Sequence, residues 1–469
     1  MKKNSQGRKG FFSPRRGLLV VALGLTTAMA PAVLDDARAE TLYRALASAY
    51  ENNPTLRAER ARQRATDEGV SQALSGWRPT IIADGDAGFE EVEGNPNFAD
   101  SSTNPAGFSV SVNQPIFRGF QTVNGTEQAE RLVLAGRQTL LGVEQDVLLD
   151  GVTAYMNVLR DARIVTLRKE NVNNLSEQLK GTRARFKVGE LTQTDVAQSR
   201  ARLSQARSDL ATARANLAAS RADYVRVIGR APASLKYPKS IRRKLPKTLD
   251  EAIAMAQQHN PGVLTARYNE EASKFAVDVA FGDLLPTADV VGRYSHREEP
   301  TSVINRTDTL SVVGQVSVPL YQAGRERSEV REAKQVNHQR KQEVLEAVRN
   351  IRDQTVTAWN AWIAARESIK SDTDQVEANK LAYRGIQQEA LVGSRTILDV
   401  LDTNEDLINS RILLVGSRRD EVVAAFQLLS ATGALTAERL PLPVAIYDPT
   451  VNLDSVRHNL FGIGIENEE

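Results

Sequence analysis

Two long stretches without proline constrain the fold of this 469-residue chain more than any other feature. All 17 prolines lie outside residues 116–231 and 320–440, which are rich in Ala, Leu, Gln, Glu and Arg. Because proline removes a helical hydrogen bond and clashes with the preceding turn, its absence over such lengths predicts long helices. A helix of about 65 residues would extend about 100 Å, which exceeds the size of a compact domain.

The chain also contains a tandem duplication of about 200 residues per copy. Pairs of short motifs recur in the same order, at offsets of 207 and then 204 residues: Thr41-Leu42 and Thr248-Leu249, Asn53-Pro54 and Asn260-Pro261, Trp77-Arg78-Pro79 and Leu284-Leu285-Pro286, Pro115-Ile116-Phe117 and Pro319-Leu320-Tyr321, Val188-Gly189 and Val392-Gly393. We therefore expect one repeat over residues 40–240, a second over residues 241–440, and a tail over residues 441–469.

A Val-Gly pair breaks each proline-free stretch near its middle. In the first copy this predicts helices over residues 120–187 and 192–229, preceded by a shorter helix over residues 55–77. Two shorter helices placed end to end would match the long helix in length. Hydrophobic residues recur every seven positions in the second helix of each pair, which predicts closely packed coiled-coil helices. In the second copy Glu421 interrupts this series.

Short alternating segments lie between the helices. Strands are expected at about residues 80–92 and 107–117 in the first copy, and at about residues 287–297 and 308–320 in the second. Polar loops, residues 94–105 and 298–307, join the members of each pair. Alternation over about ten residues suits a tilted membrane strand, although an ordinary soluble hairpin shows the same pattern.

Four strands are too few to close a membrane barrel, since known barrels begin at about eight strands. An open edge in lipid would leave backbone groups without hydrogen bonds. If these segments enter a membrane, several chains must share one barrel, and three chains would supply twelve strands. The helices would then continue this barrel as a hollow tube.

The N-terminus has the features of a secretory leader. Residues 1–39 carry seven basic and two acidic side chains, with an apolar run over residues 17–34. Ala37-Arg38-Ala39 then forms an A-x-A cleavage site, which predicts a mature chain that begins at Glu40. The remaining chain has a small negative net charge, so it offers no basic surface for nucleic acid.

Composition argues against catalysis. The chain has no cysteine, which excludes disulfides, thiol nucleophiles and cysteine-based metal sites. Its four histidines are scattered along the sequence: His259, His296, His338 and His458. We expect no enzymatic activity, cofactor or metal. A periplasmic coiled-coil adaptor or structural protein is the alternative to a duct, because it would explain the heptads but not a strand pair in each copy.

The two Thr-Leu to Asn-Pro openings, the strand ends at Pro115-Ile116-Phe117 and Pro319-Leu320-Tyr321, and the segment from Val392-Gly393 to Leu401-Asp402 resemble TolC-family proteins. The resemblance covers residues 41–435. It implies a mainly helical homotrimer, with a twelve-stranded barrel in the outer membrane above a helical barrel that crosses the periplasm.

The same resemblance implies a function. Such proteins are passive exit ducts of tripartite efflux or type I secretion systems, for small toxic compounds or secreted protein. They work with a periplasmic adaptor and an inner-membrane transporter, which is proton-driven or ATP-driven. This chain would then lie in outer-membrane lipid and extend into the periplasm, gated at its helical tip.

Four charged residues match the family's tip. Asp399 and Asp402 match the aspartates that line the tunnel constriction, and their i, i+3 spacing places both on one helix face. A trimer would gather six such carboxylates and favour cations. Asp195 and Arg395 match the gate charge pair that links neighbouring helices. Asp195 and Asp399 also fit a simpler role, since any Asp in a first helical turn complements the helix dipole.

Three further positions belong to the same region. Gly189 and Gly393 match the tips that contact the adaptor, although a turn that needs a positive φ is a sufficient reason for glycine there. The family's gating tyrosine falls at Ala390, which has no side-chain hydrogen-bond donor. This departure leaves open how the tip is held closed.

Overall fold

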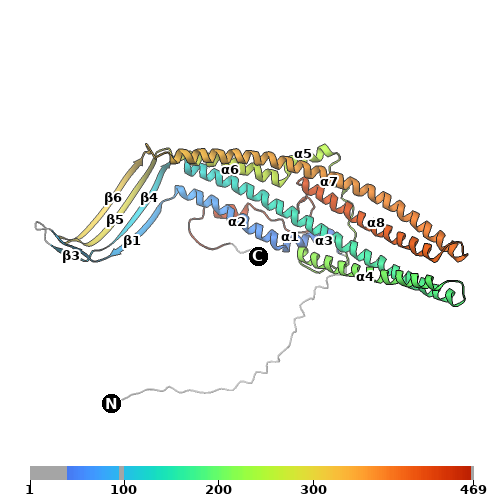
Figure 1. Cartoon of the computed structure of the whole chain (residues 1–469). Coiled ribbons are helices and arrows are strands. Elements are labelled where there is room, and N and C mark those ends of the chain that lie inside the picture. The colour runs from blue at the N-terminus through green and yellow to red at the C-terminus, as the bar shows by residue number, and fades with distance from the viewer. Residues whose placement is uncertain (1–39, 95–99, 466–469) are drawn as a thin grey trace, which may run out of the picture. The chain divides into compact units, whose positions relative to one another are not determined.

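The computed structural model of this chain describes residues 40–94 and 100–465 (Figure 1). The predicted leader, residues 1–39, therefore lies outside the described residues. The first half contains α1 (Leu42–Asn52), α2 (Pro54–Leu74), β1 (Thr80–Ala87), β2 (Glu90–Val92), β3 (Ser101–Thr103), β4 (Ala106–Arg118), α3 (Gln121–Lys187) and α4 (Gln193–Ile228). The second half contains α5 (Leu249–His259), α6 (Pro261–Gly282), β5 (Thr287–Thr301), β6 (Ile304–Ser317), α7 (Arg325–Leu391) and α8 (Ile397–Ala431), and the tail contains α9 (Val451–Val456).

Each half begins with two helices that meet at an Asn-Pro joint. The Asn53 side chain accepts a hydrogen bond from the Thr55 N–H at 2.9 Å, and the Asn260 side chain accepts one from Gly262 at 2.9 Å. Each Asn thus caps the second helix, and the proline that follows occupies the first helical turn, where no N–H is needed. The repeated dipeptide therefore ends one helix and starts the next.

The long helices α3 and α7 each span 67 residues. α3 contacts α2 along one part of its length and α4 along the other, and α7 contacts α6 and α8 in the same way (Figure 1). The prediction of two shorter helices end to end beside one long helix is confirmed. Small and large residues of the heptad seam are buried on α4: Leu203, Ala206, Leu210 and Ala213.

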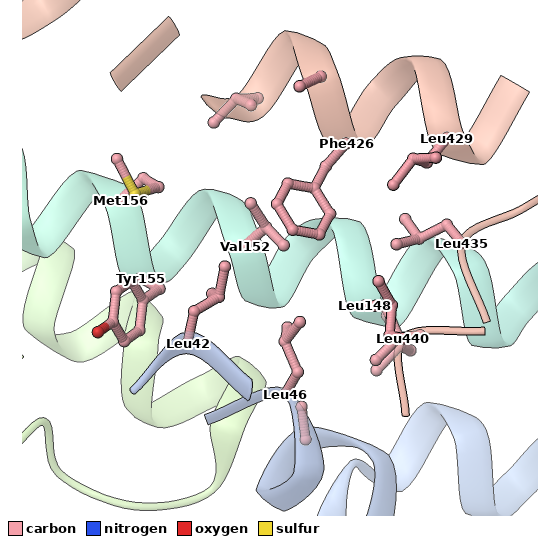
Figure 2. Packing of buried hydrophobic residues seen from close by; sticks show 14 of the residues in the cluster. Leu42, Leu46, Leu148, Val152, Tyr155, Met156, Phe426, Leu429, Leu435 and Leu440 are labelled. Carbon is pink, nitrogen blue, oxygen red and sulfur yellow. The ribbon is translucent and has the colours of Figure 1, made fainter. Parts of the chain in front are cut away.

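The main core lies where α1, α3, α8 and the start of the tail meet. Figure 2 shows α3 passing between α1 and α8, with Leu148 and Val152 packed among side chains from both. Tyr155 of α3 is fully buried, and its hydroxyl donates to the Lys236 carbonyl at 2.6 Å. The linker between the repeats is thereby fixed to the core. The same linker accounts for the charged residue that interrupts the heptad series of α8, because the Glu421 carboxylate accepts a hydrogen bond from Arg242 at 2.8 Å.

The tail packs along the first half of the chain. Leu453 of α9 lies in an apolar cluster with Val70 of α2 and Val133 of α3. Arg457 donates to Glu130 of α3 at 2.6 Å. The tail therefore covers the helical body over this stretch.

Strands β1, β4, β5 and β6 form one antiparallel sheet in that order. The β5–β6 hairpin is tighter than expected, because β5 continues to Thr301 and β6 begins at Ile304, where a loop over residues 298–307 was predicted. Polar and charged residues interrupt the hydrophobic alternation at this end of the hairpin, but they still belong to the strands. The His296 ring on β5 contacts the Asp308 side chain on β6 at 2.7 Å. β6 ends at Ser317, shortly before Pro319, which has no N–H to donate to a sheet.

The expected strand over residues 80–92 is divided. β1 ends at Ala87, and β2 pairs separately with β3 in a small two-stranded sheet. At this break the Gly88 N–H donates to the Pro105 carbonyl at 2.9 Å. Glycine and clustered acidic residues over this stretch explain why regular pairing stops.

Candidate functional site

The two helical hairpins end in equivalent tight turns. Gly189 follows α3 with φ of 82°, and Gly393 follows α7 with φ of 79°. No heavy atom of the described chain lies within 4 Å of where a side-chain carbon would stand at either glycine. The positive φ, and not close packing, therefore requires glycine at both tips.

Apolar side chains are exposed beside these glycines. Val188 is 71% exposed, and Val392 is 80% exposed, with Leu391 exposed next to it. Single exposed apolar residues are common on protein surfaces, but here equivalent valines are exposed at both tips. The two tips therefore expose the same kind of apolar side chain.

Asp195 and Asp399 each complete a capping box. The Thr396 N–H donates to Asp399 at 3.0 Å, and the Asp399 N–H donates to the Thr396 hydroxyl oxygen at 3.2 Å. Thr192 and Asp195 exchange the equivalent bonds at 2.8 and 3.3 Å. The Thr396 backbone N–H and then its hydroxyl hold the pKa of the Asp399 carboxyl below its usual value. Both aspartates therefore start the returning helix of a hairpin.

Asp402 points toward the first hairpin. Its Oδ1 accepts from Nη2 of Arg202 on α4 at 2.5 Å, and Glu405 accepts from Nη1 of the same arginine at 2.6 Å. All three side chains are partly exposed, at 37% for Arg202, 50% for Asp402 and 47% for Glu405. One guanidinium thus holds two carboxylates of α8 through separate donors.

Arg395 pairs within its own hairpin. Its Nε donates to Glu389 at 2.9 Å, and this contact raises the pKa of the guanidinium. Within one protomer, no ion pair joins Arg395 to Asp195 in the described ranges. The predicted gate pair is thus not brought together inside a single chain. Ala390, which the sequence resemblance matches to the family's tyrosine, is buried.

The second hairpin packs against the first near these charges. Ile397 and Leu401 of α8 lie in one apolar cluster with residues of α3 and α4: Leu175, Leu179, Leu203 and Ala206. Asn404 of α8 donates to the Asn171 side chain of α3 at 2.7 Å, and both residues are buried. The tip region therefore contains an apolar contact, a buried amide pair and the arginine contact between the hairpins.

Sequence reasoning missed Arg202, Glu405 and Glu389. A signal for Glu405 was present, because it continues the i, i+3 series of Asp399 and Asp402 on the same helix face. Arg202 precedes Leu203 of the buried seam, but α4 carries other arginines at similar positions. Only the packing of α8 against α4 selects Arg202 from among them.

The four-stranded sheet has two chemically different faces. Directly paired residues share a face of a sheet. One face carries mostly apolar side chains: Ile81, Ala83, Val110, Val112, Val290, Tyr294, Leu310, Val312 and Val316. The other carries mostly polar side chains: Asp84, Asp86, Ser109, Ser111, Asn113, Asp289, Arg293, Arg297, Thr309, Ser311 and Gln315. Such a division matches a membrane strand with one lipid face and one aqueous face.

The sheet has two edges that are open within the chain. Among the strands of the described residues, β1 pairs only with β4, and β6 pairs only with β5. Nearly all residues of both edge strands are exposed. In lipid, an unpaired edge leaves backbone donors and acceptors without partners, so these edges need strands from elsewhere.

Metal ligands do not cluster in residues 40–94 and 100–465, since these ranges contain no group of three or more His, Asp or Glu side chains able to hold an ion. Over the same part of the chain, no helix combines the length and the apolarity that crossing a membrane requires.

Comparisons with known proteins agree with this geometry. A family model described as outer membrane efflux protein matches residues 45–230 and 252–434. Outer membrane efflux protein BepC of Brucella suis biovar 1 (strain 1330) is 36% identical over 428 residues, which cover 91% of this chain and 92% of the relative. Outer membrane protein TolC of Escherichia coli (strain K12) is 26% identical over 421 residues, which cover 86% and 84%. The solved structure of the Campylobacter jejuni CmeC outer membrane channel matches with a TM-score of 0.77 at 14% identity, over 90% of each chain.

Proposed function

The chain belongs to the outer membrane efflux protein family, and from this premise we propose that three copies form one duct whose helical tip is a gate. The protein is an outer-membrane channel-tunnel that extends into the periplasm. The observation that carries this function is the family match across both repeats. A periplasmic adaptor or rod would leave the apolar face of the sheet without a role.

The homotrimer is supported by the open edges of the sheet. Each chain contributes β1 at one edge and β6 at the other, so β1 of one copy can pair with β6 of the next. Three copies supply twelve strands, enough for a barrel around an aqueous channel. The apolar face then contacts outer-membrane lipid, and the polar face lines the channel.

The constriction is formed by Asp399 and Asp402 of each copy. Both lie near the start of α8, within the first two turns above the Gly393 tip. Six carboxylates in a narrow tube would attract cations and repel anions. Asp195 and Arg395, which lie apart within one chain, form the gate charge pair between neighbouring copies.

The tips are the contact surface for a periplasmic adaptor. Val188 and Val392 are exposed beside Gly189 and Gly393, so the tips of both hairpins present a similar apolar side chain. The adaptor would connect the duct to an inner-membrane transporter, proton-driven or ATP-driven. The cargo is small toxic compounds or secreted protein. The duct catalyses no reaction, because the transporter supplies the energy.

The boundaries of the mature chain belong to the same proposal. Residues 1–39 form a leader that is removed at the membrane, and Glu40 becomes the first residue. The Glu40 carboxylate accepts from Arg230 at 2.7 Å, so the new end of the chain is fixed beside the end of α4. Intact-mass measurement of the purified protein tests this, and a mature chain that begins elsewhere would refute the boundary.

Single-channel conductance in planar bilayers tests the constriction. We expect small, cation-selective steps from the mature protein, and larger, less selective steps from the variant Asp399→Asn/Asp402→Asn. The control Asp374→Asn/Glu377→Gln removes two carboxylates at the same spacing from α7 and should leave conductance unchanged. If the conductance steps of Asp399→Asn/Asp402→Asn equal those of the control and of the wild type, the duct is retained, and Asp399 acts only as a helix cap.

A further inference from the structure

The arginine contact between α4 and α8 has a feature that the other ion pairs near the tip lack. Arg168 and Asp209, 3.1 Å apart, join α3 to α4 and so stay within the first hairpin. Arg395 and Glu389 stay within the second. Among the described residues, Arg202 alone provides ion pairs between α4 and α8. Its contacts therefore report on how the two hairpins sit against each other.

The geometry of Arg202 suits this position. Asp402 and Glu405 are three residues apart on α8, so their carboxylates project from one face of the helix. The guanidinium reaches both through different nitrogen atoms, at 2.5 and 2.6 Å. A lysine ammonium is a single point charge and does not reproduce this two-pronged contact.

The surroundings stabilise the contact. Leu203, the next residue on α4, and Leu401, the residue before Asp402, are both buried in the same apolar cluster. Asn404, the residue before Glu405, is held by Asn171 of α3. Exposed ion pairs are individually weak, but a pair whose backbones are fixed by packing loses less side-chain freedom when it forms. Arg202 thus forms its ion pairs between two helices whose positions are already fixed by the packing of the neighbouring residues.

We propose that Arg202 is the latch that holds the second hairpin against the first in the closed tip. The inference rests on the proposed role of the tip as a gate. When the two hairpins separate, Asp402 and Glu405 lose their arginine, and the lining of the opened tip becomes more acidic.

Arg202 therefore has two effects, one on closure and one on charge. Loss of the latch favours the open tip. Loss of the guanidinium also leaves Asp402 without its counter-charge, which favours cations in the tube. The two effects can be separated, because Glu405 takes part in the latch but carries the opposite charge.

Single-channel recordings of the full mature protein separate them. Arg202→Ala should raise the open fraction about two- to fivefold, the factor by which a partly exposed ion pair shifts an equilibrium, and should increase selectivity for K⁺ over Cl⁻. Glu405→Gln should also raise the open fraction but should not increase that selectivity. The control Arg168→Ala breaks an ion pair of the same type inside one hairpin and should change neither quantity.

Charge exchange provides the second test. Arg202→Glu should open the tip further, and Arg202→Glu/Glu405→Arg should restore part of the closure, provided that trimer formation is unchanged on native gels. If Arg202→Ala and Glu405→Gln both have the open fraction of the wild type, the latch proposal is wrong, although the duct proposal is unaffected. A wild-type protein that forms no channel would instead refute the tip gate, and the latch with it.

Discussion

The helices α3 and α7 are equivalent in the duplication, yet they occupy different environments. Both span 67 residues, and every position of α3 has its counterpart 204 residues later in α7. Eighteen residues of α3 are buried, against nine of α7. Leu148, fully buried in α3, corresponds to Arg352, exposed in α7.

The difference follows from what surrounds each helix. α3 contacts α1, α2 and α4 of its own repeat and also α6 and α8 of the second repeat. α7 contacts α5, α6 and α8. Duplication thus produced one helix at the centre of the protomer and one at its side. α7 therefore needs less apolar surface of its own within the chain.

The sharpest test of this contrast is the same truncation in both helices. Leu148→Ala creates a cavity in the α3 core and should lower the free energy of unfolding by about 2–5 kcal/mol. Leu345→Ala removes a side chain that is 51% exposed on α7 and should change it by less than about 0.5 kcal/mol. Thermal unfolding followed by circular dichroism measures both. Equal losses would mean that α7 is buried as deeply as α3 in the assembled protein.

A smaller effect is expected from tyrosine hydroxyls. Tyr155→Phe in α3 removes the donor to the Glu40 and Lys236 carbonyls and should cost about 1–3 kcal/mol. In α7, the Tyr383 hydroxyl makes no hydrogen bond with the described residues, so Tyr383→Phe should be nearly neutral. Denaturant titration of the two variants compares them. A Tyr383→Phe loss as large as that of Tyr155→Phe would place a partner from another copy at α7.

At one pair of positions the two helices should behave alike. Gly181 of α3 and Gly385 of α7 are equivalent, and both have open space where a side-chain carbon would stand. Gly181→Ala and Gly385→Ala should each stabilise the protein by about 0.5–1 kcal/mol, because alanine restricts the unfolded chain and favours helix. Unfolding midpoints of the single variants measure this. Stabilisation of one and destabilisation of the other would show that an additional surface covers one helix here.

The smallest effect concerns the tip and depends on pH. Thr396 lowers the pKa of Asp399 from its ordinary value of 3.8, so this cap stabilises the start of α8 above that value. The contribution is lost as pH falls through the lowered pKa of the folded state. Hydrogen exchange in the first turn of α8 should therefore be slower in the wild type than in Asp399→Asn at pH 7, with a difference that disappears in strong acid. Thr396→Ser retains the cap and serves as the control; a difference that persists in strong acid would contradict this origin.

Much of the fold was predictable because its signals are local. Proline-free stretches located the long helices, Asn-Pro and Val-Gly pairs located their ends, and alternation located the strands. The loop between β5 and β6 was predicted too long, since charged residues such as Glu298 and Arg306 look like a loop in sequence but pair across the two strands of the sheet. The candidate site was proposed only through family resemblance, because an aspartate in a first helical turn, such as Asp399, also fits the role of a helix cap.

The sequence by itself determined two copies of one helical unit, each with its strands and its glycine turn, because periodicity and turn chemistry act over a few residues. Only the tertiary structure decided which of the two long helices is central, since that depends on α6 and α8 packing onto α3. It also selected Arg202 among the arginines of α4. An ion pair between helices 200 residues apart in sequence exists only once packing has brought their backbones together.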